Sequence, residues 1–311
     1  MLGRSVAVRA PATSAILGPG FDTLGLALSV YEELTVEEAP AGVLEINVTG
    51  AGADEVPRDA THLVVRAIAY TYESVGRPVP GLKLTAHNVI QHGRGMGSSG
   101  AAVVAGILAA KGLLEGDVAF SDDDLLRIAT EMEGHPDNVA PALFGGLTIA
   151  WTTHDGPAHK KLLVHRGVSP LVFVPDYTMS TKLARSLQPD SVPREDAIFN
   201  VSRSALLIAA LTQSPELLLA ATEDKLHQDY RAQAMLPTIA LVQALRAEGY
   251  AAVVSGAGPS VLVLADGPGK RQAAAEIANR VSGARWEPLL LAVDFKGGTV
   301  RDVTGDSALT A

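Results

Sequence analysis

Three glycines that alternate with other residues, followed by two serines, constrain this chain most. The stretch is Gly93-Arg94-Gly95-Met96-Gly97-Ser98-Ser99-Gly100, and residues 101–114 after it predict an apolar helix. Glycine lets a backbone turn sharply and approach a ligand closely. Serines at the start of a helix place hydroxyls beside free N–H groups and the positive end of the helix dipole. The stretch therefore predicts either a phosphate seat or an ordinary glycine-rich turn that caps a helix.

The length and composition indicate a globular chain of two domains or one large one. It has 311 residues, of which 47% are hydrophobic and 19% charged, unlike a disordered chain. The formal net charge of −9 argues against a nucleic-acid surface but allows a small anion in a local basic pocket. The sequence has no cysteine, which excludes disulfides and thiolate chemistry and fits a cytoplasmic location.

No hydrophobic segment of the sequence predicts a membrane span or a signal peptide. Purely apolar runs such as residues 205–211 are far shorter than the roughly 20 residues that cross a bilayer. The start, Met1-Leu2-Gly3-Arg4, leads directly into an alternating strand over residues 5–10. We therefore expect a soluble cytoplasmic protein without a membrane partner.

Apolar periodicity predicts both strands and helices along the whole chain. Residues 33–38 and 43–49 alternate like antiparallel strands, and 82–88 predict a strand that leads into the glycine stretch. Thr61 is the expected cap of a helix through residue 74, and Ser121 begins a capping-box-like helix through residue 133. The polar segment 154–161 predicts a domain boundary, which divides the chain into residues 1–160 and 161–311.

Three further segments concentrate groups that packing alone does not require. Two carboxylates, an imidazole, a third carboxylate and an amide lie in Glu131-Met132-Glu133-Gly134-His135-Pro136-Asp137-Asn138. Small-residue loops occupy residues 14–22, which end in Asp22, and residues 255–260, which read Ser-Gly-Ala-Gly-Pro-Ser. Like the glycine stretch, both loops adjoin the end of a strand or helix.

Two common readings of the glycine stretch are disfavoured by its context. Gly95-x-Gly97-x-x-Gly100 matches the dinucleotide fingerprint, and Asp117 lies near the distance of its acidic residue. In that fingerprint the first glycine follows directly on a parallel strand, whereas here residues 89–94 intervene. The Walker pattern Gly-x4-Gly-Lys-Ser/Thr is absent from the sequence. A dehydrogenase and a P-loop protein are therefore weak alternatives.

In this order, the three loops resemble the three motifs of the GHMP kinases, over essentially the whole chain. Residues 14–22 resemble the first motif, 93–102 the phosphate loop and 255–260 the third motif. Within this superfamily, four segments are similar to the homoserine kinase family: residues 133–141, 179–182, 199–203 and 226–231.

The resemblance implies an α+β chain with the two-domain GHMP kinase fold. Residues 1–160 would form an ATP-binding domain like domain 2 of ribosomal protein S5, and 161–311 a ferredoxin-like domain, with the site between them. It implies transfer of the ATP γ-phosphate to the side-chain hydroxyl of L-homoserine, in threonine biosynthesis. The alternatives are a GHMP kinase for a mevalonate-like or sugar substrate, and a weakly active or non-catalytic nucleotide-binding homologue. A homodimer is possible, and no nucleic-acid partner is expected.

The same resemblance assigns residues to ATP and Mg²⁺. The triphosphate cradle would be Gly93, Arg94, Gly95, Met96, Gly97, Ser98, Ser99, Gly100 and Ala101, with His62 on the nucleoside side. Ser98 and Glu131 would hold Mg²⁺, which prefers oxygen ligands, with Glu133 as the competing carboxylate. Asn138 would orient the attacking hydroxyl, and Asp137 is the second candidate for this catalytic role.

The amino-acid end of the substrate would meet a second group of residues. Arg203 and Arg231 are the candidates for its carboxylate, because arginine can bind a carboxylate bidentately. Asp22 would take the ammonium group. The remaining candidates for substrate binding are His135, Thr181 and Gly258.

The sequence also departs from the family pattern. Ile16 replaces an asparagine of the first motif and removes an amide from the neighbourhood of the substrate. The other departures are Gln91 at the start of the phosphate loop, Gly100 in its tail, and His62 in place of an asparagine. Ile16 is the departure expected to weaken activity most.

Overall fold

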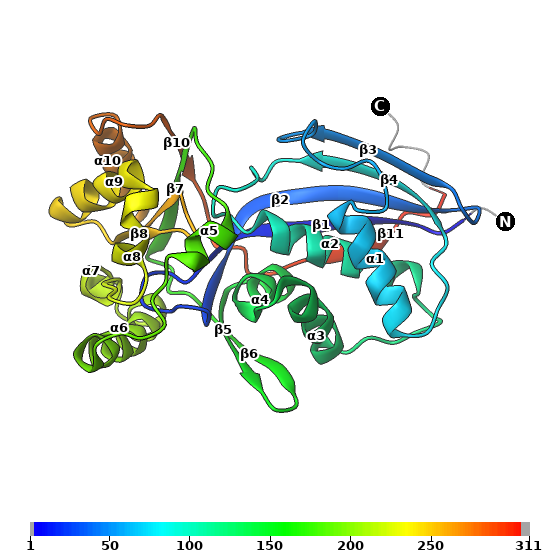
Figure 1. Cartoon of the computed structure of the whole chain (residues 1–311), viewed down its shortest axis with the longest axis horizontal. Helices are drawn as coiled ribbons and strands as arrows, with labels where there is room; N and C mark the ends of the chain where they lie inside the picture. Colours follow the sequence, from blue (N-terminus) through cyan, green and yellow to red (C-terminus); the bar gives the residue numbers. More distant parts are fainter. Residues whose placement is uncertain (1–2, 306–311) are drawn as a thin grey trace.

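Two β-sheets flanked by helices organise the chain, as the computed structural model shows (Figure 1). The structure describes residues 3–305. Met1 and Leu2 of the expected start, and residues 306–311 of the expected second domain, lie outside this range.

The first sheet has seven strands within the described residues. Its main path runs β11-β1-β2-β4-β3, and β5 pairs with both β2 and β6. These strands are β1 (Ser5–Ala15), β2 (Leu24–Ala39), β3 (Leu44–Gly50), β4 (Gly81–Asn88), β5 (Leu147–Thr153), β6 (Gly156–Leu162) and β11 (Thr299–Asp302).

The first strand, β1, changes character along its length. Val6, Val8 and Ala10 are buried in alternation, as expected of a strand with one face on the core. The register with β2 shifts between Pro11 and Ala12, where proline cannot donate to the ladder. Every residue from there to the end of β1 is buried. The bulge thus carries the end of β1 into the interior, where the first motif begins.

Four helices cover one face of the first sheet (Figure 1). They are α1 (Leu63–Ser74), α2 (Ser98–Leu113), α3 (Asp122–Glu133) and α4 (Pro136–Phe144), of which α2 and α4 contact β1 and β2 directly. The helix α2 is apolar around most of its circumference because its neighbours enclose it. The predicted capping box at Ser121 is confirmed, since its hydroxyl accepts from the Asp124 amide at 3.1 Å.

The second sheet is antiparallel, in the order β10-β7-β9-β8. Its strands are β7 (Val168–Pro175), β8 (Ala252–Val254), β9 (Val261–Asp266) and β10 (Trp286–Leu290). The helices of this half are α5 (Thr181–Ser186), α6 (Arg194–Thr212), α7 (Leu218–Ala221), α8 (Gln228–Arg231), α9 (Leu236–Ala247) and α10 (Pro268–Ala278). The succession strand, helices, two strands, helix, strand is the expected ferredoxin-like arrangement.

The sheets do not follow the expected division at residues 160 and 161. That point falls inside β6, and β11 returns from the C-terminal side to pair antiparallel with β1, Val6 opposite Asp302. The return has a physical reason, because without β11 the outer edge of β1 would present unpaired N–H and C=O groups. The first sheet therefore takes strands from both ends of the chain.

Two local expectations were wrong. Residues 33–38 and 43–49 are not paired, because β4 lies between them, antiparallel to β2 and parallel to β3. The N-cap of α1 is His62 rather than Thr61, whose hydroxyl instead donates to Asp59 at 2.6 Å. The neighbours of β4 are β2 and β3, so α2, which follows β4 and the glycine loop, leads to no parallel neighbour of β4 as a dinucleotide site would require.

A single hydrophobic cluster spans both sheets. It includes Leu26 and Val104 of the first half together with Val172 and Leu262 of the second. A smaller cluster lies between the second sheet and helices α9 and α10. Among the residues the structure describes, no helix combines the length and apolar character needed to cross a membrane.

Candidate active site

Backbone and side-chain hydrogen bonds join the three small-residue loops. The Gly256 amide donates to the Ala15 carbonyl at 3.1 Å, and the Ser260 amide donates to the Arg94 carbonyl at 3.2 Å. The Ser255 hydroxyl donates to the Gly95 carbonyl at 2.6 Å. Segments far apart in the sequence, 160 residues for Ser255 and Gly95, thus meet at one place.

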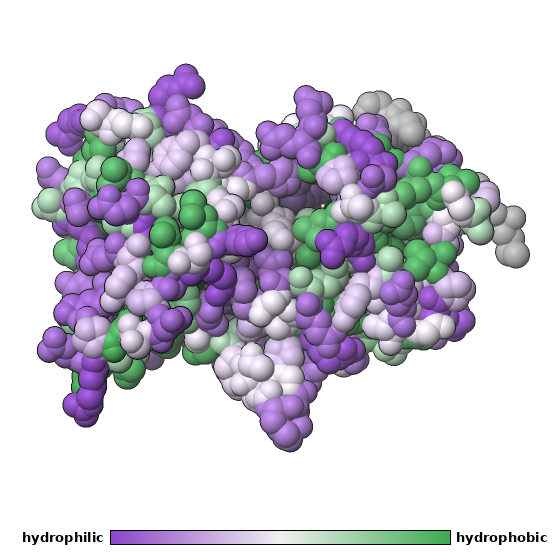
Figure 2. Space-filling model, in the orientation of Figure 1, coloured by the Kyte–Doolittle hydropathy of each residue, from purple (hydrophilic) through white to green (hydrophobic). Residues whose placement is uncertain are grey.

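A cleft of about 640 Å³, including its open mouth, lies where the loops meet. Figure 2 shows a hollow between the two halves of the molecule. Its lining includes eleven residues that the sequence singled out: Gly93, Gly95, Gly97, Ser98, Ser99, His135, Asp137, Asn138, Thr181, Arg231 and Gly258. The sequence-based selection therefore converges on one cavity from five separate segments.

The glycine loop presents backbone rather than side chains to this cleft. Gly95 and Gly97 have φ angles of 75° and 68°, and Gly97 is the N-cap of α2. A Cβ at Gly95 would overlap the Ser255 carbonyl oxygen, and one at Gly97 would overlap the Thr13 hydroxyl. The first N–H groups of α2, with the positive end of its dipole, therefore lie at the cleft without side chains in the way.

Not every residue of the predicted cradle lines the cleft. The Arg94 guanidinium donates to the carbonyls of Pro175 and Tyr177, which ties the loop to the second half of the chain. Met96 and Ala101 are buried in the core. Gly100, in α2, packs against Asn138 of α4. These residues shape the loop and do not face its interior.

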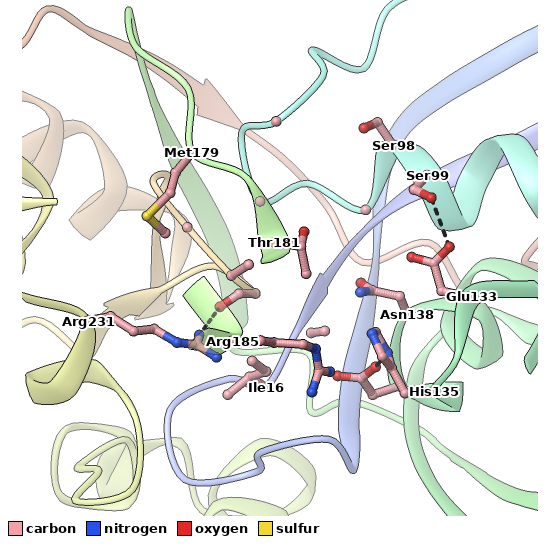
Figure 3. A pocket seen from close by; sticks show the side chains of 18 residues that line it. Ile16, Ser98, Ser99, Glu133, His135, Asn138, Met179, Thr181, Arg185 and Arg231 are labelled. Atoms are coloured by element: carbon pink, nitrogen blue, oxygen red, sulfur yellow. Dashed lines mark hydrogen bonds and ion pairs between the residues drawn. The ribbon is translucent and has the colours of Figure 1, made fainter. Parts of the chain in front are cut away.

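The junction of α3 and α4 supplies the polar groups opposite the glycine loop (Figure 3). His135 Nδ1 and Asp137 Oδ1 are 2.5 Å apart, and Asp137 is 1% exposed. This hydrogen bond raises the pKa of His135 against the opposing effect of its burial. Asn138 Oδ1 accepts from the Thr13 hydroxyl at 3.1 Å, which leaves its Nδ2 group available to a ligand.

The two carboxylates of α3 point to different surroundings. Glu133 lines the cleft and accepts from the Ser99 hydroxyl at 2.8 Å, and burial raises the pKa of its carboxyl. Glu131 accepts from the Tyr70 hydroxyl at 2.8 Å and pairs with Arg127 at 3.1 Å, away from the cleft lining. Residues i and i+2 of a helix do not share a face. The structure therefore brings Glu133, and not Glu131, to the serines of the loop.

The arginines at the cleft are Arg185 and Arg231. Arg203, predicted beside Arg231, is absent from the lining, pairs with Glu223 at 2.7 Å and lies 4.2 Å from the centre of the Phe199 ring. Sequence reasoning missed Arg185 as a site residue. The available signal was its position four residues after Thr181, one helical turn away on the same face.

Arg231 is a buried cation with no acidic partner in the part of the chain that the structure describes. It is 1% exposed, and its Nη1 contacts the Gly256 carbonyl at 3.3 Å and His227 Nδ1 at 3.4 Å. Within residues 3–305 no acidic side chain forms an ion pair with it. Burial and the nearby Arg185 charge lower the pKa of Arg231 to about 10. Such a group favours an anionic ligand, because an unpaired buried charge is costly.

Asp22 is linked to the cleft by its ion pair with Arg185. Its carboxylate pairs with Arg185 Nη2 at 2.8 Å, and hydrogen bonding to Asp22 raises the pKa of Arg185. The guanidinium of Arg185 lies within the cleft lining, although Asp22 is not part of that lining. A carboxylate and two arginines thus gather at one end of the cavity.

A second pocket of about 830 Å³ adjoins the first and shares Ser98 and Ser99 with it. Its lining includes the apolar Leu63, Val64 and Ala102 and the polar side chains of Glu32, His62, Asn88 and His92. Glu32 accepts from the Ile90 amide at 2.8 Å, and burial raises the pKa of its carboxyl to about 7. His62 is 6% exposed, and burial lowers the pKa of its imidazole.

Family models match both halves of the chain. The model of the GHMP kinases N terminal domain matches residues 62–146, which contain the glycine loop, and the model of the GHMP kinases C terminal matches residues 205–284. Fold, site and family models agree, and the chain belongs to the GHMP kinases.

Relatives of high identity give its position within this class. The chain is 67% identical to "Homoserine kinase" of Leifsonia xyli subsp. xyli, over 98% of this chain and 94% of the relative. It is also 67% identical to "Homoserine kinase" of Clavibacter michiganensis subsp. michiganensis, over 99% and 98%. The crystal structure of homoserine kinase from Cytophaga hutchinsonii has a TM-score of 0.85 and 26% identity, over 96% of this chain and 97% of that one. The chain is thus a member of the homoserine kinase family, an ATP-dependent phosphotransferase for an alcohol group.

Proposed function

We propose that this protein transfers the γ-phosphate of ATP to the side-chain hydroxyl of L-homoserine, giving O-phospho-L-homoserine in threonine biosynthesis. One observation carries the choice of an amino acid as acceptor. Arg231 is buried at the cleft and pairs with no acidic side chain of residues 3–305, and Arg185, which pairs with Asp22, lines the same cavity. An amino acid supplies a carboxylate for the arginines and an ammonium group for Asp22, whereas a sugar supplies neither charge. The names of the 67% identical relatives support the same acceptor.

ATP would bind across both pockets. Its base and ribose would enter the second pocket beside His62, and its phosphates would reach the glycine loop through Ser98 and Ser99, which both pockets share. Free amides at the start of α2 suit the phosphates because they donate hydrogen bonds and carry the positive end of the dipole. The γ-phosphate then faces the first cleft.

The residues at the glycine loop fit Mg²⁺ bound together with ATP. The described residues contain no group of three or more His, Cys, Asp or Glu that could hold a metal alone. Mg²⁺ usually takes only one or two protein carboxylates and completes its shell with phosphates and water. Ser98 and Glu133 would be its protein ligands, in place of the predicted pair Ser98 and Glu131. When bound, the ion would neutralise charge on the phosphates.

Homoserine would lie between the arginines and Asn138. Its carboxylate would bind Arg231 and Arg185, and its ammonium group would bind Asp22, which now pairs with Arg185. Thr181, His135 and Gly258 line the cavity around it. Asn138 Nδ2 would then hold the hydroxyl oxygen at the far end, because Asn138 Oδ1 is already bonded to Thr13.

The transfer itself requires alignment more than a strong base. The hydroxyl oxygen forms a bond to the γ-phosphorus while the bond to the bridging oxygen of ATP breaks, and ADP leaves. The hydroxyl proton passes to a non-bridging oxygen of the transferred phosphate group. Charge in such a transfer is spread over the phosphoryl oxygens, so positioning and electrostatic stabilisation supply most of the catalysis. The buried Asp137, bonded to His135, would hold the start of α4 and with it Asn138.

A matched pair of arginine variants tests the acceptor site. We expect Arg185→Gln to raise the KM for homoserine about 100-fold, as expected for losing a charge-assisted hydrogen bond, and to change the KM for ATP little. Arg203→Gln, which removes a similarly sheltered arginine outside the cleft, should change either KM less than about three-fold. Collapse of homoserine use in Arg203→Gln with an unaffected Arg185→Gln would contradict the assignment.

A matched pair of glutamate variants tests the metal ligands. Glu133→Gln should raise the Mg²⁺ concentration for half-maximal phosphorylation at least about ten-fold, whereas Glu131→Gln should leave it unchanged. The opposite result would restore the predicted role of Glu131.

A cytoplasmic location and a homodimer stay predictions.

A further inference from the structure

The backbone of Ile16 is held in a conformation that its side chain disfavours. Its φ angle is 73°, followed by 54° at Leu17, and β-branched residues are genuine outliers in this left-handed region. Both polar backbone groups of Ile16 are fixed: its amide donates to the Leu24 carbonyl at 2.7 Å, and its carbonyl accepts from Gly20 at 3.0 Å. The surrounding loop therefore imposes the conformation and the direction of the side chain.

The imposed direction places Ile16 in the wall of the cleft. The residue is 5% exposed and lines the same cavity as Arg185 and Arg231 (Figure 3). Thr13, three residues earlier near the end of β1, donates from its hydroxyl to Asn138, at the end of the site proposed for the acceptor hydroxyl. The segment 13–16 thus runs from one end of the proposed acceptor site to the other. Ala15, Met179 and Ala257 add apolar surface to the same lining.

We propose that Ile16 is a specificity-determining residue that forms an apolar wall against the methylene carbons of the acceptor. This inference rests on the proposed function. An acceptor with a polar group between its α-carbon and the phosphorylated hydroxyl would bury that group without a hydrogen-bond partner. A buried polar group without a partner loses the hydrogen bonds it made in water. An apolar wall rejects one added hydroxyl by roughly 10- to 100-fold in kcat/KM.

The probe is 4-hydroxy-L-threonine, which differs from L-homoserine only by a hydroxyl on the β-carbon. We expect the wild-type protein to prefer L-homoserine by at least about ten-fold in kcat/KM, equivalent to about 1.4 kcal/mol. Ile16→Asn supplies an amide at this wall and should reduce the preference below about three-fold. Ile16→Val keeps an apolar β-branched side chain and should retain it.

A thermal-unfolding measurement on each variant separates specificity from folding. Asparagine and glycine tolerate the left-handed region, so relief of the backbone strain offsets part of the apolar burial that Ile16→Asn and Ile16→Gly lose. Should Ile16→Asn fail to fold, Ile16→Gly, which removes the wall, is expected to lower the preference in its place. An unchanged preference in a folded Ile16→Asn overturns the inference. So does a wild-type protein that uses both acceptors equally, whereas a wild-type protein that uses neither rejects the proposed function itself.

Discussion

His135 and Asp137 form the tightest polar pair of the cleft, and its energy depends on pH. The hydrogen bond to Asp137 raises the pKa of His135 above its ordinary value. Stability from a raised histidine pKa is fully present below the unfolded value of about 6.5 and is lost as pH rises through the folded value. The pair should therefore stabilise the fold most in mildly acidic solution.

Replacing His135 by Gln tests this dependence. The variant should lose about 1–2 kcal/mol of unfolding free energy near pH 6, in the range of a hydrogen bond between charged groups, and less at pH 9. Denaturant titrations of both proteins at the two pH values measure the difference. His154→Gln is the control, because that side chain is 88% exposed and should show little effect. A loss that grows with pH would contradict the prediction.

The sequence predicted residue types at the site better than individual contacts. It identified the glycine loop, His135, Asp137 and Asn138, because their density in short segments is visible without a structure. It chose Arg203 where the structure brings Arg185, and Glu131 where the structure brings Glu133. The choice between Glu131 and Glu133 depends on which face of α3 turns toward the cleft, and the choice between Arg203 and Arg185 depends on whether α6 or α5 brings its arginine there. Both are set by packing between distant elements, such as that of α3 against α2, α4 and β6, which no local pattern records.

The glycine loop and α2 work as one element, whose shape depends on the absence of side chains. Gly95→Ala would force a Cβ onto the Ser255 carbonyl, which the third loop holds in place. We expect it to lose more than about 3 kcal/mol of stability and most of its ATP affinity. Gly116→Ala is the control: its φ of 87° is also positive, but no atom lies within 4 Å of the added Cβ. It should lose only about 1–2 kcal/mol, the cost of the backbone conformation, and should keep ATP binding by calorimetry. Equal losses would argue against the proposed crowding.

The capping box of α3 gives a prediction in which stability falls and activity does not change. Ser121→Ala removes the hydroxyl that accepts from the Asp124 amide, and should lower the unfolding free energy by about 1 kcal/mol. Because Ser121 and Glu133 lie at opposite ends of α3, kcat and both KM values should stay unchanged. A large fall in activity at constant folding would mean that the position of Glu133 is coupled to the start of α3.

Elements with local signals were predicted well, and those decided by distant partners were not. The capping box marked the start of α3 and Gly134 its end, as found. The neighbour of β3 could not be read from its sequence, since parallel pairing with β4 depends on the crossover through α1. The return of β11 to β1 was missed for the same reason, because almost 300 residues separate the partners.

The whole molecule should unfold in one transition in spite of its two sheets. One hydrophobic cluster includes residues of both sheets, and hydrogen bonds between the three loops join the two halves. Independent domains would instead have separate cores. Differential scanning calorimetry should therefore give a single peak whose calorimetric and van't Hoff enthalpies agree. ATP at 100 times its Kd should shift that peak as a unit, by about 2.7 kcal/mol of stability. Two resolved peaks would contradict this.

The antiparallel pairing of β1 with β11 places the two ends of the described chain next to each other. The Val303 amide donates to the Ser5 carbonyl at 2.9 Å, and the Ser5 amide donates to the Thr304 hydroxyl at the same distance. A short peptide could therefore join the ends, and new ends could be opened at the exposed Asp155 in the β5–β6 hairpin, which projects from the body (Figure 1). In such a circular permutant the order of the three loops along the polypeptide would change while their meeting point would not. For this kinase fold, the order of the motifs along the sequence then depends on the position of the chain ends and not on the geometry of the site.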